Sequence, residues 1–306
     1  LFRALLTLHL RQYMIYLRPL LPRQRTLRAM SSSVVQHYQE GSLMSRVLQG
    51  LDESSIDIAT LTPAQLHPID QFHIGGLKAL RSLLSHVDIK PGARVLDLGC
   101  GLGGTCRVIA GQHPDARVLG VDITPEFIEV SKTLTKMVNM ENINYEVGSG
   151  TEIPAPDASV DVMVMVYVGM NIEDKDALFT EACRVLAPGG VFAVKDVVLE
   201  ENKTSDDILY PVPWATEPAQ SAATHQQAYL DAAAHAGLEL LQGPQLLREE
   251  GMGFANSLPP SGPPPLSLPR ITFGLNGLQK MKNVVSLLKT ETIIPCEMIF
   301  QKKQSE

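Results

Sequence analysis

The sequence predicts an α/β fold built on a mostly parallel sheet with helices on both faces. Two observations carry this prediction. Five short β-branched runs alternate with helical stretches between residues 94 and 198, and the first run leads into a glycine-rich turn. Strands separated by helices of this length form βαβ units with right-handed crossovers. The 306 residues, 44% of them hydrophobic, suffice for one large domain with additions.

The elements follow in order along the chain. We expect strands at residues 94–98, 117–122, 143–147, 160–166 and 191–198, with helices at 103–111, 125–138 and 174–186 between them. Residues 188–190, Pro-Gly-Gly, predict a tight turn. Thr224 and Gln227 indicate a capping box for a helix at 224–235, which Gly237 would end. Two late strands, 238–241 and 293–301, complete a predicted seven-stranded sheet.

Three parts are expected along the chain. Residues 1–30 read as an extension, residues 31–90 as an N-terminal helical cap, and residues 91–306 as the main domain. Within the main domain we expect insertions at about 200–223 and 247–290 that roof a substrate site. The second insertion begins with a Pro/Gly-rich stretch at 251–269 and continues into a helix at 276–289. Long irregular segments of this kind are more often functional than idle.

The first residues differ from the rest in charge. Residues 1–39 contain no Asp or Glu, and six arginines fall within residues 1–29. An Arg-rich, acid-free, amphipathic start is typical of an organellar transit peptide, which predicts a mitochondrial or plastid location. The alternative is that translation begins at Met30, which predicts a cytoplasmic protein. No uninterrupted apolar run reaches the roughly 18 residues of a membrane span.

Composition excludes several classes of function. The net charge is −7, which disfavours general nucleic-acid binding because phosphates require a basic surface. The four cysteines include no CxxC pair, and the histidines lack ligand spacing. We therefore expect neither a disulfide scaffold nor a metal site.

The sharpest motif is the glycine-rich turn after the first strand. Gly99, Gly101 and Gly104 allow a ligand to approach the backbone, and they also satisfy the GxGxxG pattern of dinucleotide sites. Asp122 closes the next strand, where a carboxylate can bind both hydroxyls of a ribose. Asp97 discriminates between ligands, because its charge would repel a pyrophosphate and attract an ammonium or a sulfonium. S-adenosylmethionine carries both cations; a turn without any ligand is the remaining alternative.

These residues resemble a known family. Residues 96–104 and 120–124 resemble class I S-adenosylmethionine-dependent methyltransferases, which have a Rossmann-like sheet. Four further strings, at 70–76, 170–175, 210–215 and 262–266, are similar to the sarcosine/dimethylglycine N-methyltransferase branch, whose members make glycine betaine. The resemblance spans about residues 34–302.

The resemblance implies a cofactor site and two departures from the family pattern. Ser149 stands where the family usually has an acidic residue for the adenine, unless Glu152 substitutes, and Tyr167 stands where the branch commonly has His. The implied cofactor-binding residues are Tyr38, Asp97, Gly99, Cys100, Gly101, Asp122, Ile123, Ser149, Gly150, Thr151 and Val166.

Four residues are the candidates for acceptor binding and catalysis. His73 is a candidate base, with a turn-capping role as the alternative. Trp214 and Tyr210 offer aromatic faces for a methylammonium group, and Asn171 is placed to orient the acceptor. A carboxylate on the acceptor would need an arginine, for which the late segment offers Arg248 and Arg270.

The function that follows is methyl transfer from S-adenosylmethionine to a small amine, with sarcosine or dimethylglycine as the leading acceptor. The alternatives are another small acceptor, namely a sulfur compound, a different amine or a quinone/sterol-type lipid, and a cofactor-binding protein without catalysis. The partner is then a small molecule rather than nucleic acid. A homodimer is left open as the assembly.

Overall fold

The computed structural model describes residues 42–71, 73–257, 264, 266–272 and 277–304. The chain divides into two units, residues 1–49 and residues 50–306. The first unit is described only from residue 42 and includes the start of helix α3 (Leu43–Glu53). The second unit contains the whole sheet. Tyr38 and the predicted extension at residues 1–30 lie outside the described residues.

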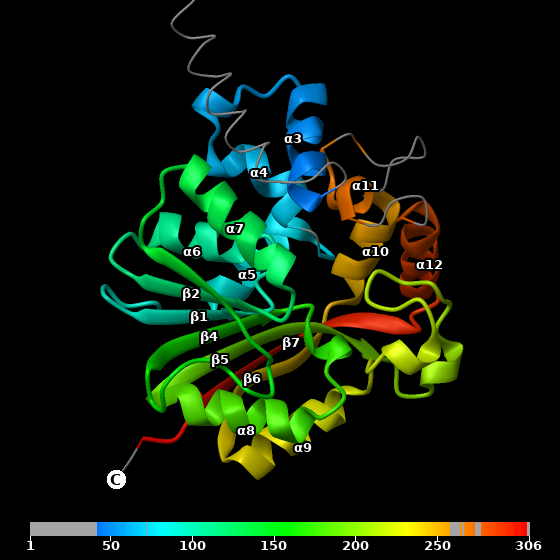
Figure 1. The fold of residues 1–306 in the computed structure, drawn as a ribbon. Helices are drawn as coiled ribbons and strands as arrows, with labels where there is room; N and C mark the ends of the chain where they lie inside the picture. Colours follow the sequence, from blue (N-terminus) through cyan, green and yellow to red (C-terminus); the bar gives the residue numbers. More distant parts are fainter. Residues whose placement is uncertain (1–41, 72, 258–263, 265, 273–276, 305–306) are drawn as a thin grey trace, which may run out of the picture. The chain divides into compact units, whose positions relative to one another are not determined.

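The second unit is built on one seven-stranded sheet (Figure 1), as predicted. Its strand order is β3-β2-β1-β4-β5-β7-β6, and only β7 runs antiparallel to its neighbours. The strands are β1 (Arg94–Leu98), β2 (Arg117–Asp122), β3 (Ile143–Val147), β4 (Val160–Val166), β5 (Leu186–Leu199), β6 (Leu238–Leu246) and β7 (Ile293–Lys302).

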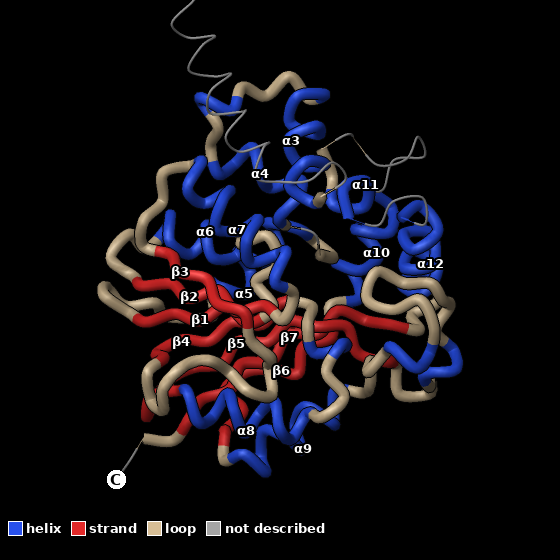
Figure 2. The backbone as a smooth tube through the Cα atoms, viewed as in Figure 1, coloured by secondary structure: helices blue, strands red, loops and turns tan. Residues whose placement is uncertain are grey.

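Helices cover both faces of this sheet, as Figure 2 shows for the strands in red and the helices in blue. One face packs against α5 (Gly76–Ser85), α6 (Gly104–Gln112) and α7 (Pro125–Met137), and the other against α8 (Lys175–Val185) and α9 (Gln226–Ala236). Successive side chains of β4 point to opposite faces of the sheet and contribute to the apolar core on each face. Val162 and Val164 pack in the core with α5, α6 and α7, and Met163 and Met165 pack in the core with α8 and α9.

Local signals explain where the central helices begin. Asp174 caps α8 by accepting a hydrogen bond from the Ala177 amide at 2.8 Å. Pro125 occupies the first turn of α7, where its missing N–H costs nothing. The α8 face then buries Phe179, whose ring lies edge-on to Phe300 with centroids 5.2 Å apart.

Additional helices surround the carboxyl ends of the strands. They are α4 (Pro63–Asp70), α10 (Arg248–Ser257), α11 (Leu268–Thr272), α12 (Gly277–Lys289) and the short 3-10 helices η1 (Ile58–Thr60), η2 (Gly169–Asn171), η3 (Ser205–Asp207) and η4 (Pro218–Gln220). A capping box between Thr62 and Gln65 starts α4. None of the described helices combines the length and apolar character needed to cross a bilayer.

Four local predictions were wrong. The Thr224 capping box does not form, because α9 begins at Gln226 with His225 at the cap and no side-chain bond there; Gly237 ends the helix as predicted. Residues 188–190 lie inside β5, where the register against β4 shifts, so they form an irregular strand rather than a turn. Strand β6 runs to Leu246 because it pairs with β7 beyond the predicted end. Residues up to Ser257 of the Pro/Gly-rich stretch are helical, in α10.

Candidate active site

A cavity of about 440 Å³ lies at the carboxyl ends of β1, β2 and β4, the edge at which open α/β sheets bind ligands. The structure brings most of the predicted cofactor-binding residues together here. Thr151 is absent from the lining. The predicted residues that line the cavity are His73, Asp97, Gly99, Cys100, Gly101, Asp122, Ile123, Ser149, Gly150, Val166 and Asn171.

The glycine-rich turn is shaped for close approach. Gly99 and Gly101 have φ values of 71° and 53°, in the left-handed region that favours glycine. A Cβ on Gly99 would come within 2.2 Å of the Val168 side chain. The Asp122 carboxylate accepts hydrogen bonds from the Gly101 amide at 3.0 Å and the Thr124 amide at 2.9 Å, which ties the turn to the end of β2.

Asp97 is a buried acid that forms no ion pair with any of the described residues. Its side chain accepts a hydrogen bond from the Cys106 thiol at 3.1 Å and is only 2% exposed. Burial above all, with the charge of Asp122, raises the pKa of Asp97 to about 7, although the hydrogen bond from Cys106 and the charge of Arg107 lower it. A bound ammonium group would supply the missing positive charge. The residues present therefore fit S-adenosylmethionine, as the sequence predicts.

The part of the cavity where the resemblance places the adenine has an apolar wall and a neutral polar group. Ile123 is 71% exposed, and Phe127 lines the same cavity. The Ser149 hydroxyl accepts a hydrogen bond from the Thr151 amide at 3.2 Å and lies 2.9 Å from the Thr151 hydroxyl. Thr151 therefore contacts the Ser149 hydroxyl without lining the cavity itself. Glu152 does not line the cavity, so it does not replace the acid that Ser149 lacks.

A second, smaller cavity of about 240 Å³ adjoins the first; we call it the acceptor cavity. His73, Tyr167 and Asn171 line both, so the two cavities share a wall. The acceptor cavity is lined by aromatic, apolar and neutral polar side chains. They are His73, Ile74, Tyr167, Met170, Asn171, Val197, Pro213, Trp214, Phe254, Met281 and Val284.

His73 is neutral at physiological pH. Burial above all, with the charge of Lys195, lowers its pKa to about 4, although the contact with the Ile74 carbonyl raises it. Its ring nitrogens lie 3.3 Å from Gln71 Oε1 and 3.4 Å from the Ile74 carbonyl oxygen. A neutral imidazole carries one N–H, so it donates to only one of these oxygens at a time. The ring stacks on Tyr167, whose own φ of 56° is uncommon for a bulky residue.

Of the two aromatic residues predicted to contact the acceptor, only one lines the acceptor cavity. Trp214 lines the acceptor cavity, and its indole N–H donates to the Ser221 hydroxyl at 3.0 Å. Tyr210 lines neither of these cavities, nor the larger cavity described below. It packs against the same apolar cluster as Trp214, and its hydroxyl is buried without a hydrogen-bond partner among the described residues. Its predicted role as an aromatic contact for the acceptor is therefore not supported by its position.

The two candidate arginines also lie elsewhere. Arg248 pairs with Glu200 and Glu291, and Arg270 pairs with Glu53 at 2.9 Å. Neither lines the acceptor cavity.

Sequence reasoning missed an ionic cluster behind the acceptor cavity. Lys195 of β5 is fully buried, with its Nζ 2.7 Å from Glu297 of β7 and 2.9 Å from Glu250 of α10. Beside it, the buried Asp196 accepts a hydrogen bond from the Tyr229 hydroxyl at 3.0 Å, and burial raises its pKa to about 6. The only signals of this cluster in the sequence were a lysine and acidic residues inside otherwise apolar strands.

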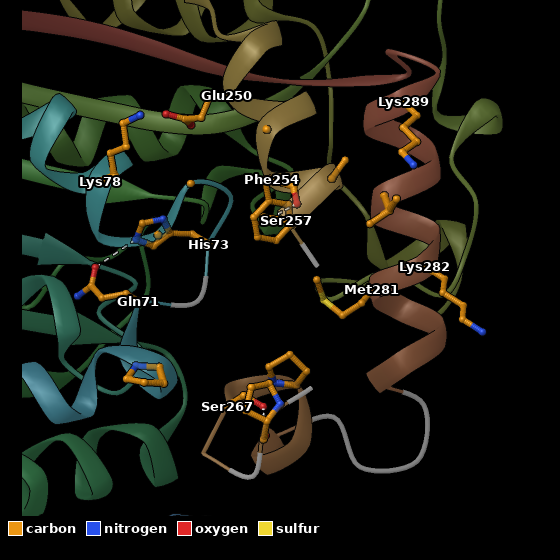
Figure 3. Close-up of a pocket in the computed structure, with 18 of the residues that line it drawn as sticks. Gln71, His73, Lys78, Glu250, Phe254, Ser257, Ser267, Met281, Lys282 and Lys289 are labelled. Carbon is orange, nitrogen blue, oxygen red and sulfur yellow. Dashed lines mark hydrogen bonds between the residues drawn. The ribbon is translucent and has the colours of Figure 1, made fainter. Parts of the chain in front are cut away.

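A third cavity, of about 1010 Å³, shares lining residues with the acceptor cavity, and we call it the outer cavity. His73, Phe254 and Met281 line both. Figure 3 shows His73, hydrogen-bonded to Gln71, on one side and Phe254 and Met281 on the other. Lys282 and Lys289 of α12 line the outer cavity as well. Among the described residues, no group of three or more His, Cys, Asp or Glu side chains is arranged to hold a metal ion.

Comparison with known proteins agrees with this geometry. Residues 89–237 match the family profile described as a methyltransferase domain. An arsenite methyltransferase of Halobacterium salinarum is 38% identical over 109 residues, which are 35% of this chain and 28% of that protein. Phosphoethanolamine N-methyltransferase 3 of Arabidopsis thaliana is 32% identical over 134 residues, 44% of this chain and 27% of that protein. The matches thus span less than a third of either relative.

Solved structures show the same fold over more of the chain. A protein assigned as a sarcosine dimethylglycine methyltransferase from Galdieria sulphuraria superposes with a TM-score of 0.62 at 20% identity, covering 74% of this chain and 86% of that one. Phosphoethanolamine N-methyltransferase 2 of Haemonchus contortus also gives a TM-score of 0.62, at 17% identity, covering 88% of this chain and 62% of that one. Residues 89–237 thus match a methyltransferase domain, and the seven-stranded sheet that contains them has the fold of these solved structures.

Proposed function

We propose that this protein transfers a methyl group from S-adenosylmethionine to a small amine bound in the acceptor cavity. One observation carries the proposal. The cavity that contains the buried Asp97 carboxylate shares a wall, made by His73, Tyr167 and Asn171, with the aromatic acceptor cavity. A donor held by Asp97 and Asp122 would thus have its reactive end beside the acceptor.

The protein's contribution to this reaction is binding and orientation. S-adenosylmethionine supplies an electrophilic methyl group on a sulfonium. Asp97 would bind the ammonium of the donor, and Asp122, already oriented by the Gly101 and Thr124 amides, would bind its ribose hydroxyls. Displacement at a methyl group requires the acceptor lone pair opposite the departing sulfur, so fixing both molecules across one wall supplies much of the acceleration.

The walls of the acceptor cavity favour an amine over more polar acceptors. Trp214 offers an aromatic face, and contacts between a cation and such a face contribute about 0.5–2 kcal/mol. A neutral His73 does not repel the positive charge that develops on a methylated nitrogen. A tertiary amine loses no proton and needs no base. For a primary or secondary amine, His73 is a weak proton acceptor because its pKa is lowered to about 4.

Sarcosine and dimethylglycine are the acceptors that the sequence resemblance favours. A labelling experiment tests the function and the acceptor together. The full chain is incubated with methyl-labelled S-adenosylmethionine and with glycine, sarcosine, dimethylglycine, simple alkylamines and thioethers, and the products are read by mass spectrometry. Label in any amine supports the proposal, whereas label only in the thioethers would reject the amine. Cofactor binding without any product would favour a non-catalytic protein.

A further inference from the structure

We propose that the acceptor is an amine with no carboxylate next to its nitrogen, and that its longer substituent extends past Phe254 and Met281 into the outer cavity. This inference rests on the proposed function and narrows it. Dimethylglycine carries its carboxylate one carbon from the nitrogen. The carboxylate would therefore have to lie inside the 240 Å³ acceptor cavity together with the reacting atom.

The acceptor cavity offers a carboxylate no cation. None of the described residues that line it is Lys or Arg, and its one histidine is neutral. A buried carboxylate without a positive partner is strongly disfavoured.

Three polar side chains of the cavity are engaged with other protein groups, whereas the Tyr167 hydroxyl is buried without a partner among the described residues. The Asn171 amide nitrogen donates to the Val168 carbonyl oxygen at 3.1 Å, and the Trp214 N–H donates to Ser221. The His73 ring nitrogens face Gln71 and Ile74. An amine nitrogen needs none of these donors, because its lone pair is directed at the methyl group. A carboxylate would need several of them.

Negative charge lies behind the cavity wall. Two carboxylates, Glu250 and Glu297, surround the single ammonium of Lys195. At His73 the charge of Lys195 acts in the opposite direction and lowers the pKa. At the Tyr167 hydroxyl, burial raises the pKa and the charges of Glu250, Asp196 and Glu297 raise it further, so this part of the wall is in a negative potential. This potential repels a carboxylate and attracts a cation.

The reaction itself moves a positive charge into this environment. The lone pair of a tertiary amine forms the new N–C bond as the S–C bond breaks, and the electron pair of that bond stays on sulfur. Sulfur becomes neutral, and nitrogen becomes a quaternary ammonium without loss of a proton. Aromatic faces at Tyr167, Trp214 and Phe254, backed by carboxylates, stabilise this product charge.

The outer cavity explains what the acceptor carries beyond its nitrogen. It shares Phe254 and Met281 with the acceptor cavity and has about four times its volume (Figure 3). Apolar side chains that line it, such as Leu278 and Val285, suit an alkyl or aryl substituent. Its charged lining side chains are of both signs: Lys78, Lys282, Lys289, Glu249 and Glu250.

Matched substrates test this directly. The full chain is assayed with dimethylglycine, its methyl ester and N,N-dimethylbenzylamine, and each kcat/KM is corrected for the unprotonated fraction of the amine. We expect the ester and the benzylamine to exceed dimethylglycine by at least about tenfold, because only dimethylglycine buries an unpaired charge. Equal or faster turnover of dimethylglycine would overturn the inference while leaving the proposed function intact. Methylation of none of the amines, with S-adenosylmethionine bound, would overturn both.

A variant with an added cation provides the complementary test. Met281→Lys places an ammonium at the boundary of the two cavities, and Met281→Leu is the control of similar volume. We expect the lysine variant to raise the ratio of kcat/KM for dimethylglycine to that for its ester by at least about tenfold, and the leucine variant to leave the ratio unchanged. The ratio is independent of the fraction of enzyme that is folded. An unchanged ratio in both variants would contradict the inference.

Discussion

The rings of His73 and Tyr167 stack with centroids 5.7 Å apart and planes inclined by 13°, in the wall shared by the cofactor cavity and the acceptor cavity. One ring comes from the segment after α4 and the other from the end of β4. The pair therefore links the α4–α5 region to the sheet at the place where the methyl group would cross. Its neutrality follows from burial, which lowers the pKa of His73 and raises that of Tyr167.

The Tyr167 hydroxyl gives a first prediction. It is buried without a hydrogen-bond partner among the described residues, so Tyr167→Phe removes a desolvated polar group and keeps the stacked ring. We expect Tyr167→Phe to raise the free energy of unfolding by up to about 1–3 kcal/mol and to keep the affinity for S-adenosylmethionine within about twofold. Tyr167→Ala removes the ring and should destabilise the protein. Denaturant unfolding and titration calorimetry measure both, and a destabilised phenylalanine variant would show that the hydroxyl has a partner.

We expect the substitution Asp97→Asn to have opposite effects on stability and on cofactor binding. Asp97 has a native pKa of about 7, above the unfolded value of 3.8, so its ionisation costs stability as pH rises from about 4 through 7. Asp97→Asn removes this cost, so the variant should gain stability over the wild type at pH 8 and not at pH 4. The same variant should bind S-adenosylmethionine at least about tenfold more weakly, because a charge-assisted contact is lost. Thermal unfolding at the two pH values, with calorimetry at pH 8, tests both effects.

The pH dependence of cofactor affinity follows from the same group. Only the ionised Asp97 attracts the donor's ammonium, so affinity should fall as pH decreases below about 7, by at most tenfold per pH unit. Asp97→Asn should show a flatter profile between pH 8 and pH 5.5. Identical slopes for the wild type and the variant would remove Asp97 from the binding site.

A buried ion pair joins α4 to α6. Arg107 donates to Asp70 at 2.7 Å, and the side chains of both residues are 1% exposed. Asp70→Asn leaves the guanidinium buried without its partner, and we expect a loss of about 3–5 kcal/mol in the free energy of unfolding. Glu129→Gln breaks the exposed pair with Lys132 and serves as the matched control, with an expected loss below about 1 kcal/mol. Similar losses in the two variants would contradict the assignment.

Alanine substitutions at the glycines of the turn distinguish a steric clash from backbone strain. Gly99→Ala meets Val168 and a positive φ, whereas Gly101→Ala meets only a positive φ, since no other atom lies within 4 Å of the position that its Cβ would take. Gly253→Ala, inside α10 with open space around it, should stabilise the protein by about 0.5–1 kcal/mol. We expect stability to decrease in the order Gly253→Ala, Gly101→Ala, Gly99→Ala in thermal unfolding. A Gly99 variant as stable as the Gly101 variant would show that Val168 moves aside.

The cofactor side of the site could be predicted from sequence, and the acceptor side only in part. Residues 97–101 and Asp122 lie next to strand ends, and strand alternation fixes where such ends meet. Phe254 and Met281 reach the acceptor cavity from α10 and α12, whose packing depends on contacts between distant parts of the chain such as Lys195 with Glu250. Tyr210 was misplaced for the same reason. Adjacency in a Tyr-Pro-Val-Pro-Trp string does not decide which of two rings faces a cavity.

Binding of S-adenosylmethionine to the full chain, measured by titration calorimetry beside Asp122→Ala, is the most direct test of the central claim. Asp122 orients the glycine-rich turn and would bind the ribose. The account predicts saturable binding at a ratio of one to the wild type, and affinity at least about 100-fold weaker in the variant, because charge-assisted hydrogen bonds are lost. Absence of binding to the folded wild type, or equal affinity in the variant, would contradict it.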